Sequence, residues 1–447
     1  MTSTVSPSPA YLSSLAPRVQ HALDTLERAR EHTLAIIAPL SDEDVSTQHD
    51  PLMSPILWDL GHIAAFETLW LLHNLVGPIE FSEMPGTYNP FEHPRSTRGA
   101  LPLPTLDGQR AELARVRDAV RARLAMESFD AASPLLRDAY VVRMVAQHER
   151  QHQETILQTL QLKQGKPYAA PRAWSLPLGA TPARDDAMVR FPGGRIRIGT
   201  DDRTESYDNE RPSHDVTIAP FDMDVLPVTN AAYLRFVEAG GYDDRAHWSD
   251  AGWAWRTESG IRAPKHWERG ADGRWTTRAM DVISELDPLQ PVCHVCYHEA
   301  DAYARSVGKR LPTEQEWEAA ATWNPTSGVQ QLFPWGNDAS TRSLANVDQL
   351  GFGTAQVHAY PLNVSPIGCY GMIGDVWEWT SSDFAGYPNF SAFPYPEYSE
   401  VFFGTEYKVL RGGSWATSAD VARPTFRNWD YAIRRQIFAG FRCARDA

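Results

Sequence analysis

The sequence predicts an α+β protein with two dissimilar parts, a four-helix bundle followed by a domain rich in loops. Apolar residues recur at helical spacing between about residues 17 and 165. Four prolines then fall within 166–186, which is too many for a helix and predicts an extended linker. Twelve of the 15 tryptophans lie after Asp186, among many glycines and short β-like runs. We therefore predict a helical domain at 1–165, a linker at 166–186 and a second domain at 187–447.

The helical part contains four long amphipathic segments. Apolar side chains recur every three or four positions in 19–29, 58–72, 106–124 and 141–160. This spacing places them on one face of a helix, and four such helices joined by loops are typical of an up-down bundle. Ser41 and Asp42 are expected to begin a further short helix, and Pro55 suits the first turn of the second long one.

The second part shows shorter elements. Runs at 195–199 and 215–218 have the composition of short strands. Helical spacing survives only in short pieces near 230–239, 298–307 and 313–322. Short strands, abundant turns and tryptophan-rich loops together predict an irregular α+β domain dominated by loops.

The composition limits the classes of partner. Among 447 residues, 42 Lys+Arg stand against 56 Asp+Glu, a net charge of -14. Such an acidic surface repels phosphate backbones, so nucleic acid is not expected as a partner. Four cysteines exclude a disulfide scaffold and favour a reducing compartment. Because 1–16 lacks the pattern of a signal peptide and no apolar stretch approaches about 18 residues, we expect a cytoplasmic protein without membrane contact, and a monomer as the simplest assembly.

Most of the chemical signal lies in His148 and His152, which enclose Glu149 in an H-E-x-x-H pattern. Two histidines four residues apart project from one face of a helix and can bind one metal ion. His62 is the best candidate for a third ligand, because it lies on the inward stripe of the second long helix and bundle metal sites use inward side chains of facing helices. Three histidines suit Zn(II), Fe(II) or Cu, and ligand type alone does not choose among them.

Two other interpretations of these residues stay open. A lone histidine on an apolar stripe is usually an ordinary core residue, although two on one stripe and a third on another helix favour a metal site. Glu149 lies about 100° around the helix from His148, so it is expected to be solvated or to lie just outside the ligand set. In a zinc hydrolase, Glu149 would instead be the general base.

Several strings in the second part together resemble one known domain. They are R-L-P-T-E at 310–314, E-W-E-A-A at 316–320, F-P-W-G at 333–336, G-M-I-G-D-V-W-E-W at 371–379, R-G-G-S-W at 411–415 and G-F-R at 440–442. From about Met188 to Arg445 the chain resembles the formylglycine-generating-enzyme/sulfatase-modifying-factor domain, which implies a C-type-lectin-like fold. Formylglycine-generating oxidases carry a cysteine pair shortly after the R-G-G-S string, where this chain has Thr417 and Ala422. That departure argues against sulfatase modification.

The first part resembles a DinB-like four-helix bundle with a histidine metal site. A DinB-like bundle followed by a lectin-like domain is similar, over nearly the whole chain, to the ergothioneine-biosynthesis iron(II)-dependent sulfoxide synthases. The resemblance implies that His62, His148 and His152 bind Fe(II). It also implies that the enzyme uses O2 to join hercynine, which is Nα-trimethylhistidine, to a thiol, and so forms a hercynyl sulfoxide.

Charged residues indicate which thiol the chain uses. Arg95 and Arg98 after the second helix, and Asp430 and Arg434 near the C-terminal end, resemble the members that use γ-glutamylcysteine. Guanidinium groups bind carboxylates bidentately, and an aspartate pairs with an ammonium group, which suits a dipeptide with two carboxylates and one ammonium. Free cysteine stays open as the thiol, as does a related synthase that attaches sulfur to histidine itself.

The resemblance also assigns Gln151, Asn428 and Trp429 to hercynine. A trimethylammonium group donates no N–H hydrogen bond, so aromatic faces and amide oxygens are expected around it. A tyrosine beside the O2 position is expected to donate a proton or hydrogen atom, with Tyr395 favoured and Tyr387 next. A non-catalytic binding module is a further alternative, since lectin-like domains often only bind ligands, and it predicts no metal-dependent turnover.

Overall fold

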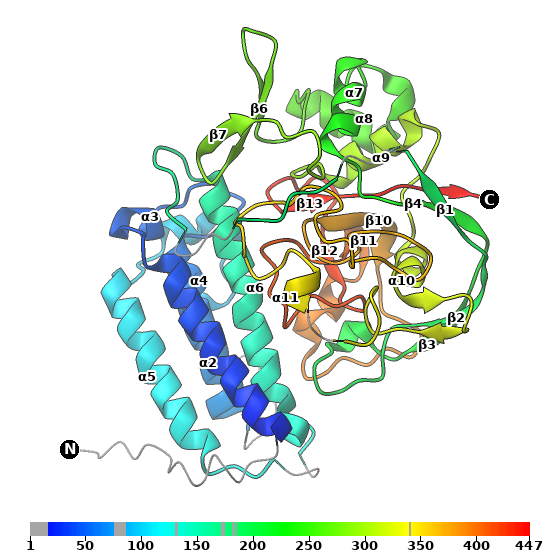
Figure 1. Ribbon diagram of the computed structural model, residues 1–447. Helices are drawn as coiled ribbons and strands as arrows, with labels where there is room; N and C mark the ends of the chain where they lie inside the picture. Colours follow the sequence, from blue (N-terminus) through cyan, green and yellow to red (C-terminus); the bar gives the residue numbers. More distant parts are fainter. Residues whose placement is uncertain are drawn as a thin grey trace. The chain divides into compact units, whose positions relative to one another are not determined.

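The computed structural model describes residues 17–75, 86–129, 133–170, 175–180, 184, 186–338 and 341–447 (Figure 1). Contacts divide the chain into two compact units. The first comprises Met1–Pro171, Asp202–Tyr207 and Phe393–Tyr395, and the second comprises Arg172–Asp201, Asp208–Ala392 and Pro396–Ala447. Two short segments that follow the bundle helices in sequence therefore belong to the helical unit.

The first unit is built on four long helices that lie side by side (Figure 1). They are α2 (Pro17–Ile37), α4 (Ile56–Thr68), α5 (Leu106–Leu124) and α6 (Tyr140–Leu162). Helix α2 packs against α6, and α4 packs against both α5 and α6. Buried residues such as Leu26 on α2 and Val120 on α5 fall on the predicted apolar stripes. The predicted four-helix bundle is confirmed.

Shorter helical elements complete this unit. Helix α3 (Asp42–Ser46) begins where predicted, because the Ser41 hydroxyl accepts from the backbone N–H of Asp44 while the Asp44 carboxylate accepts from that of Ser41. The other short elements are the π-helical η1 (Leu69–His73) and the 3-10 turns η3 (Gly86–Tyr88), η4 (Arg95–Ala100) and η5 (Arg137–Ala139).

Helix α4 is more deeply buried than a one-sided apolar stripe predicts. Every residue from Ile56 to Glu67 is buried, so other elements cover all of its faces. Turn η3 contacts α4, and a Cβ added at Gly61 would lie 2.0 Å from the Tyr88 ring. Glycine at this position therefore lets Tyr88 pack directly on the backbone of the helix.

The second unit combines small sheets with short helices. Its four-stranded sheet has the order β12 (Asn428–Tyr431), β11 (Gly404–Arg411), β10 (Trp377–Phe384), β13 (Ala439–Gly440). The pairs β10–β11 and β11–β12 are antiparallel, and β10–β13 is parallel. A three-stranded sheet has the order β1 (Met188–Phe191), β4 (Phe221–Asp224), β14 (Ala444–Asp446).

Smaller pairings and helices surround these sheets. The remaining strands are β2 (Gly194–Ile198) with β3 (His214–Ile218), β5 (Trp267–Arg269) with β6 (Trp275–Ala279) and β7 (Val282–Glu285), and β8 (Trp323–Asn324) with β9 (Val329–Gln330). The α-helices are α7 (Asn230–Glu238), α8 (Asp250–Ser259), α9 (Tyr297–Ser306), α10 (Glu314–Thr322) and α11 (Thr341–Leu344). The 3-10 turns are η6 (Asp208–Glu210), η7 (Arg245–His247), η8 (Pro396–Tyr398) and η9 (Glu400–Phe402).

An apolar core and buried ion pairs hold this loop-rich unit together. The core includes Phe191, Trp317 and Met372. Arg442 donates to Glu378 at 2.7 Å, in a pair that is almost fully buried. Such pairs satisfy polar groups that a small amount of regular structure leaves inside.

The predicted α+β class is confirmed. Strands β2 and β3 and helices α7, α9 and α10 coincide closely with the predicted short elements, whereas α8 was missed although Ser249 caps it. In the expected linker, 166–170 and 175–180 contain no helix or strand, and 171–174, 181–183 and 185 lie outside the described residues. The domain limits stay a prediction. Over the described ranges, no helix is both long and apolar enough to span a bilayer.

Candidate metal centre

Three histidines converge inside the first unit. His62 lies on α4, and His148 and His152 lie one turn apart on α6. Their ligand atoms all lie within 4.8 Å of one another. Among the His, Cys, Asp and Glu residues that the structure describes, these three form a group that could hold a metal ion. The ring centroids are separated by 5.1, 4.8 and 4.6 Å. One ion can therefore contact all three rings.

Hydrogen bonds orient two of these rings. The Nδ1 atom of His62 lies 2.8 Å from the carbonyl oxygen of Tyr88, and Nδ1 of His152 lies 2.9 Å from Oδ1 of Asp59. A carbonyl oxygen can only accept, so His62 donates from Nδ1, and the Asp59 carboxylate assigns the same role to His152. In a neutral ring the other nitrogen, Nε2, then keeps its lone pair, which is the tautomer that binds a metal with a supporting partner behind it.

Burial keeps the imidazoles of His62 and His148 neutral. Desolvation lowers the pKa of His62 well below its usual value, and the neighbouring His152 lowers it further. Desolvation also lowers the pKa of His148, with contributions from His152 and His62. Neutral imidazole is the form that coordinates a metal, so the buried site favours ligation over protonation near neutral pH.

Aromatic rings fix the planes of the histidines. Phe66 stacks on His148 with ring centroids 3.6 Å apart, and Trp58 stacks on His62 at 4.9 Å. The indole nitrogen of Trp58 donates to the carbonyl oxygen of Thr87 at 2.8 Å, which holds the ring in place. The metal ligands are therefore fixed by packing as well as by hydrogen bonds.

The structure separates the two candidate tyrosines. Tyr395 belongs to the helical unit, where its ring lies 4.9 Å from Trp70 and 6.2 Å from Phe66, and it is 6% exposed. Tyr387 belongs to the second unit, where Arg427 lies 4.2 Å over its ring, and burial raises its pKa. Only Tyr395 thus shares a compact unit with the three histidines.

Gln151 has a partner that the sequence did not reveal. Its Nε2 donates to the hydroxyl of Tyr207 at 2.8 Å. Tyr207 is 3% exposed and lies in the segment Asp202–Tyr207 that joins the helical unit. The side chain between the two α6 histidines in sequence is therefore fixed by a residue 56 positions later in the chain.

Arg98 is a buried cation beside the histidines. Its guanidinium carbon lies 3.5 Å from the centroid of Trp58, the ring that stacks on His62. Arg98 donates to Ser54 Oγ and to the His93 carbonyl oxygen, both at 2.8 Å, and it forms no ion pair with any residue the structure describes. Burial lowers its pKa to about 10, so it stays charged at neutral pH.

Arg95 is held differently from Arg98. It is half-buried and donates to the carbonyl oxygen of Leu52 at 3.3 Å. Both arginines lie on turn η4, so the predicted pair is adjacent in space, but only Arg98 stacks next to a candidate ligand.

The remaining predicted residues cluster on and after β12 in the second unit. Trp429 stacks on Phe384 with centroids 4.2 Å apart, and Asn428 Oδ1 accepts from the backbone N–H of Trp429. Asp430 pairs with Arg434 at 3.4 Å, and Nη1 of Arg434 is buried with no hydrogen-bond partner among the described residues. The structure thus groups these four with one another.

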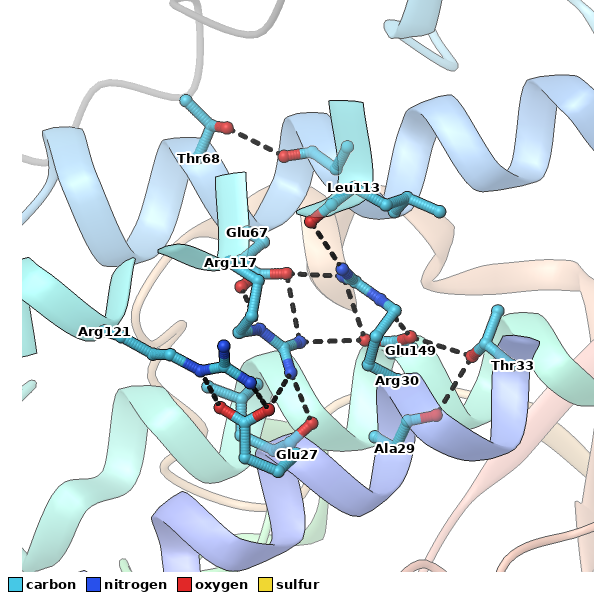
Figure 2. A network of polar contacts seen from close by, with 12 residues as sticks. Glu27, Ala29, Arg30, Thr33, Glu67, Thr68, Leu113, Arg117, Arg121 and Glu149 are labelled. Carbon is cyan, nitrogen blue, oxygen red and sulfur yellow. Dashed lines mark hydrogen bonds and ion pairs between the residues drawn. The ribbon is translucent and has the colours of Figure 1, made fainter. Parts of the chain in front are cut away.

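Glu149 is buried, and its hydrogen-bond partners are Arg30, Thr33 and Arg117 rather than the three histidines (Figure 2). It is 1% exposed. Its carboxylate accepts from Arg30 at 2.9 Å and from Thr33 at 2.8 Å. Burial opposes ionisation, but Arg30 and Arg117 hold its pKa below the usual value. The expectation of a solvated glutamate was wrong, because its partners lie on other helices, 32 to 119 residues away in sequence.

Sequence reasoning missed several residues that shape this site. Asp59 precedes His62 by three residues on the same helix, so helical spacing was an available signal for it. Tyr88 acts through its backbone carbonyl and through its contact with Gly61, and no side-chain pattern reports either. Tyr207 carries no local signal, since its partner Gln151 lies 56 residues earlier.

Family profiles match both parts of the chain. The profile described as the DinB superfamily matches residues 25–156, and the profile described as the sulfatase-modifying factor enzyme 1-like domain matches residues 177–447. The chain is therefore a DinB-type bundle joined to a sulfatase-modifying-factor-type domain, as predicted.

Relatives that match over nearly their whole length identify the family within this class. The chain is 44% identical over 428 residues to the hercynine oxygenase of Mycolicibacterium thermoresistibile, covering 94% of this chain and 93% of the relative. It is 43% identical to the hercynine oxygenases of Mycolicibacterium smegmatis (95% and 98% covered) and Mycobacterium tuberculosis (94% and 97%). The chain belongs to the hercynine oxygenase family, which confirms the resemblance and the prediction of an oxygen-dependent oxidoreductase.

Proposed function

We propose that this chain joins hercynine to the sulfur of a thiol at a non-haem iron(II) centre, with O2 as the oxidant. Membership of the hercynine oxygenase family supports the substrate and the oxidant. The observation that carries the site assignment is the convergence of His62, His148 and His152, whose ligand atoms lie within 4.8 Å of one another.

The donor set fits iron(II). Three imidazole ligands without a protein carboxylate leave coordination positions for small molecules. His62 and His152 each have Nδ1 engaged and Nε2 available, as expected of supported ligands. Zinc and copper also suit such ligands, and it is the oxygenase family that favours iron. When bound, iron would supply the one-electron chemistry that activates O2.

The overall reaction balances without an external reductant. The C–H bond at the imidazole carbon between the ring nitrogens of hercynine breaks, as does the S–H bond of the thiol, and a C–S bond forms. One oxygen atom of O2 ends on sulfur and the other leaves as water with the two hydrogens. Carbon and sulfur together lose four electrons, the number that O2 accepts.

We assign the proton transfer in this reaction to Tyr395. Its ring lies in the unit of the histidines and 6.2 Å from Phe66, which itself stacks on His148. Tyr387, the second candidate, is engaged by Arg427 and accepts a hydrogen bond from Arg411 at 3.5 Å. Those contacts give Tyr387 a role in holding the second unit together.

We propose γ-glutamylcysteine as the thiol. Arg98 supports this choice, since a buried cation with no ion pair among the described residues suits an incoming carboxylate. It stacks on Trp58, which in turn stacks on His62, so that carboxylate would lie close to the metal ligands. The roles of Arg95, Asp430 and Arg434 toward the thiol rest on the family resemblance.

For hercynine we propose Gln151, Asn428 and Trp429. The aromatic face of Trp429 and the amide groups of the other two suit a cation that cannot donate hydrogen bonds. These assignments also rest on the resemblance, and the hydrogen bond from Gln151 to Tyr207 gives Gln151 a fixed position from which to act. A cytoplasmic location and a monomeric state stay predictions.

A zinc hydrolase has less support. The H-E-x-x-H interpretation needs Glu149 beside the metal as a general base. In this structure its carboxylate is engaged by Arg30, Arg117 and Thr33. Freeing it would remove one of the two buried carboxylates that balance Arg30 and Arg117 and leave Glu67 as the other, which is strongly unfavourable.

The test is anaerobic reconstitution with Fe(II), then oxygen uptake and mass spectrometry with hercynine plus each thiol. Uptake that needs both substrates, with a product mass equal to their sum plus one oxygen less two hydrogens, is the expected result with γ-glutamylcysteine. A preference for free cysteine would keep the chemistry and overturn the thiol. No uptake with either thiol, together with tightly bound zinc, would overturn the proposal.

A further inference from the structure

Four charged side chains are buried inside the helical bundle. They are Arg30 on α2, Glu67 on α4, Arg117 on α5 and Glu149 on α6, and we call them the charge box (Figure 2). Their side chains are between 0 and 7% exposed. Two positive and two negative charges make the box neutral, and each of the four long helices contributes one member.

Each arginine of the charge box bridges both glutamates. Arg30 donates to Glu67 at 2.6 Å and to Glu149 at 2.9 Å. Arg117 donates to Glu67 at 2.7 Å and to Glu149 at 3.4 Å. The box therefore links α4 to α6 through two independent bridges.

Backbone contacts anchor the two arginines. Arg30 Nη1 donates to the carbonyl oxygen of Leu113 at 2.8 Å, and Arg117 Nη1 donates to that of Leu26 at 2.9 Å. Each guanidinium thus ties its own helix to the backbone of another. Planar guanidinium groups with several directional donors hold such a geometry more strictly than apolar contacts do.

The glutamates lie on the same helices as the histidines. Glu149 follows His148 directly on α6, and Glu67 lies five residues after His62 on α4. Successive helical residues are about 100° apart, so Glu149 lies about 100° around α6 from His148, and Glu67 lies about 140° around α4 from His62. A rotation or slide of α6 relative to α4 cannot move the histidines without stretching the hydrogen bonds of the charge box.

Stability alone is a weak explanation for the charge box. A buried ion-pair cluster often gives no net stability over well-packed apolar residues of similar volume, because desolvation offsets the attraction. The better-attested use of buried polar groups is to fix register. The charge box links α4 and α6, which supply the three histidines, so the register that it would fix is the one between these two helices.

We propose that the charge box is a positioning network, which sets the register of α4 and α6 and thereby the geometry of the three-histidine site. The inference rests on the proposed metal-binding function. Its members do not touch the metal; they act through His62, His148 and His152. Breaking the box is expected to weaken metal binding in protein that is still folded.

Cobalt(II) titration of the full-length metal-free chain, followed by visible absorption, is the direct readout. Glu149→Gln is expected to weaken Co(II) binding about tenfold, the lower end of what supporting residues contribute to metal affinity, and to change the absorption envelope. This variant leaves an unbalanced buried cation, so its stability is measured in parallel by thermal unfolding.

The double variant Arg30→Met/Glu149→Met separates positioning from stability. It removes one charge of each sign and leaves the Arg117–Glu67 pair, so the thermal midpoint is expected to recover relative to Glu149→Gln. Co(II) affinity is expected to stay reduced, because Met supplies no directional bridge between α4 and α6. Recovery of affinity together with the midpoint would overturn the positioning role.

Two controls match these variants. Leu160→Ala leaves a cavity on α6, since Leu160 is 1% exposed, at a position 11 residues after Glu149. Arg121→Gln removes the half-exposed pair with Glu27 at the outer end of the network in Figure 2. Both variants are expected to keep wild-type Co(II) affinity within about twofold, because neither residue is one of the three histidines or a member of the charge box.

The outcomes distinguish this inference from the proposed function. If the wild-type chain binds Co(II) and Glu149→Gln binds it equally well, the charge box is only structural. If the wild-type chain binds no Co(II), both the metal site and the positioning role are overturned. Weaker binding in the charge-box variants, with unchanged binding in both controls, supports the inference.

Discussion

The bundle buries two kinds of polar side chain, and they differ in what their atoms do. In the charge box, each carboxylate meets two guanidinium groups within hydrogen-bond reach. In the histidine cluster, His62 and His152 each have one ring nitrogen engaged and the other available. The saturated set can hold helices together, whereas the open set can take a ligand.

Arg98 and Arg117 show the same contrast between two buried arginines. Arg117 lies between Glu67 and Glu149. Arg98 stacks on Trp58 and forms no ion pair within the described residues. Burying a cation without a paired carboxylate is unfavourable, which supports the proposal that Arg98 receives a carboxylate of the thiol substrate. Both kinds of residue look alike in a sequence, as charged positions on helices or turns.

The largest expected effect comes from removing one histidine of the three-histidine cluster. Replacing His148 by alanine is expected to weaken metal binding more than about a hundredfold, since even a supporting residue contributes 10- to 100-fold. Bound metal is measured by elemental analysis after Fe(II) reconstitution and gel filtration. The control is His21→Ala, which removes an exposed histidine of α2. Wild-type metal content in the His148 variant would contradict the assignment.

The two tyrosines sharpen the comparison between the units. Tyr395→Phe is expected to lower kcat by about a hundredfold, the lower range for a positioned proton donor, with little effect on stability. Tyr387→Phe removes the hydroxyl that accepts from Arg411, so it is expected to lower the melting temperature and leave kcat nearly unchanged. Steady-state kinetics and thermal unfolding check both, and the reverse pattern would exchange the two roles.

Arg98 sharpens the comparison between the two arginines. Arg98→Met keeps the stack on Trp58 partly filled and removes the charge. A charge-assisted hydrogen bond contributes about 1.5–3 kcal/mol, so KM for γ-glutamylcysteine is expected to rise about ten- to a hundredfold while KM for hercynine changes little. Arg110→Met, a change at a more exposed arginine of α5, is the matched control. An equal rise for both substrates would remove Arg98 from the thiol site.

The smallest expected effect is on how the free energy of unfolding of the metal-free chain depends on pH. His62 and His148 have depressed pKa values in the folded state, so below about pH 6.5, the usual pKa of histidine, the unfolded chain binds more protons. Their contribution to stability is complete above that pH. It is lost on acidification by up to about 1.4 kcal/mol per pH unit for each histidine.

Urea unfolding between about pH 5 and 7 tests this slope. His148→Gln is expected to flatten the acid limb relative to wild type, because one depressed group is gone. His21→Gln, at the exposed position on α2, is expected to leave the slope unchanged. An unaltered slope in the His148 variant would mean that this ring is not held neutral by burial.

The sequence predicted the parts of the molecule that depend on short-range periodicity. The four apolar stripes, the spacing of His148 and His152, and the inward place of His62 all follow from helical geometry. The short helix at Ser41 and Asp42 follows from capping chemistry. These features require only neighbours a few residues away.

Features that depend on distant partners could not be predicted in this way. In the sequence, Glu149 looks like a residue on the polar face of an amphipathic helix. Its burial depends on Arg30, which lies 119 residues earlier. Tyr207 and Tyr395 join the helical unit through segments that no local pattern marks. Asp59 lies between these cases, since its helical spacing from His62 was visible but its bond to His152 spans 93 residues.

The central claim is that His62, His148 and His152 together hold the catalytic iron. Anomalous diffraction at the iron absorption edge, from crystals of the Fe(II)-loaded chain, tests it most directly. One strong anomalous peak is expected, within bonding distance of a ring nitrogen from each of the three histidines. A peak elsewhere, or one bonded to fewer than three of these rings, would contradict the account.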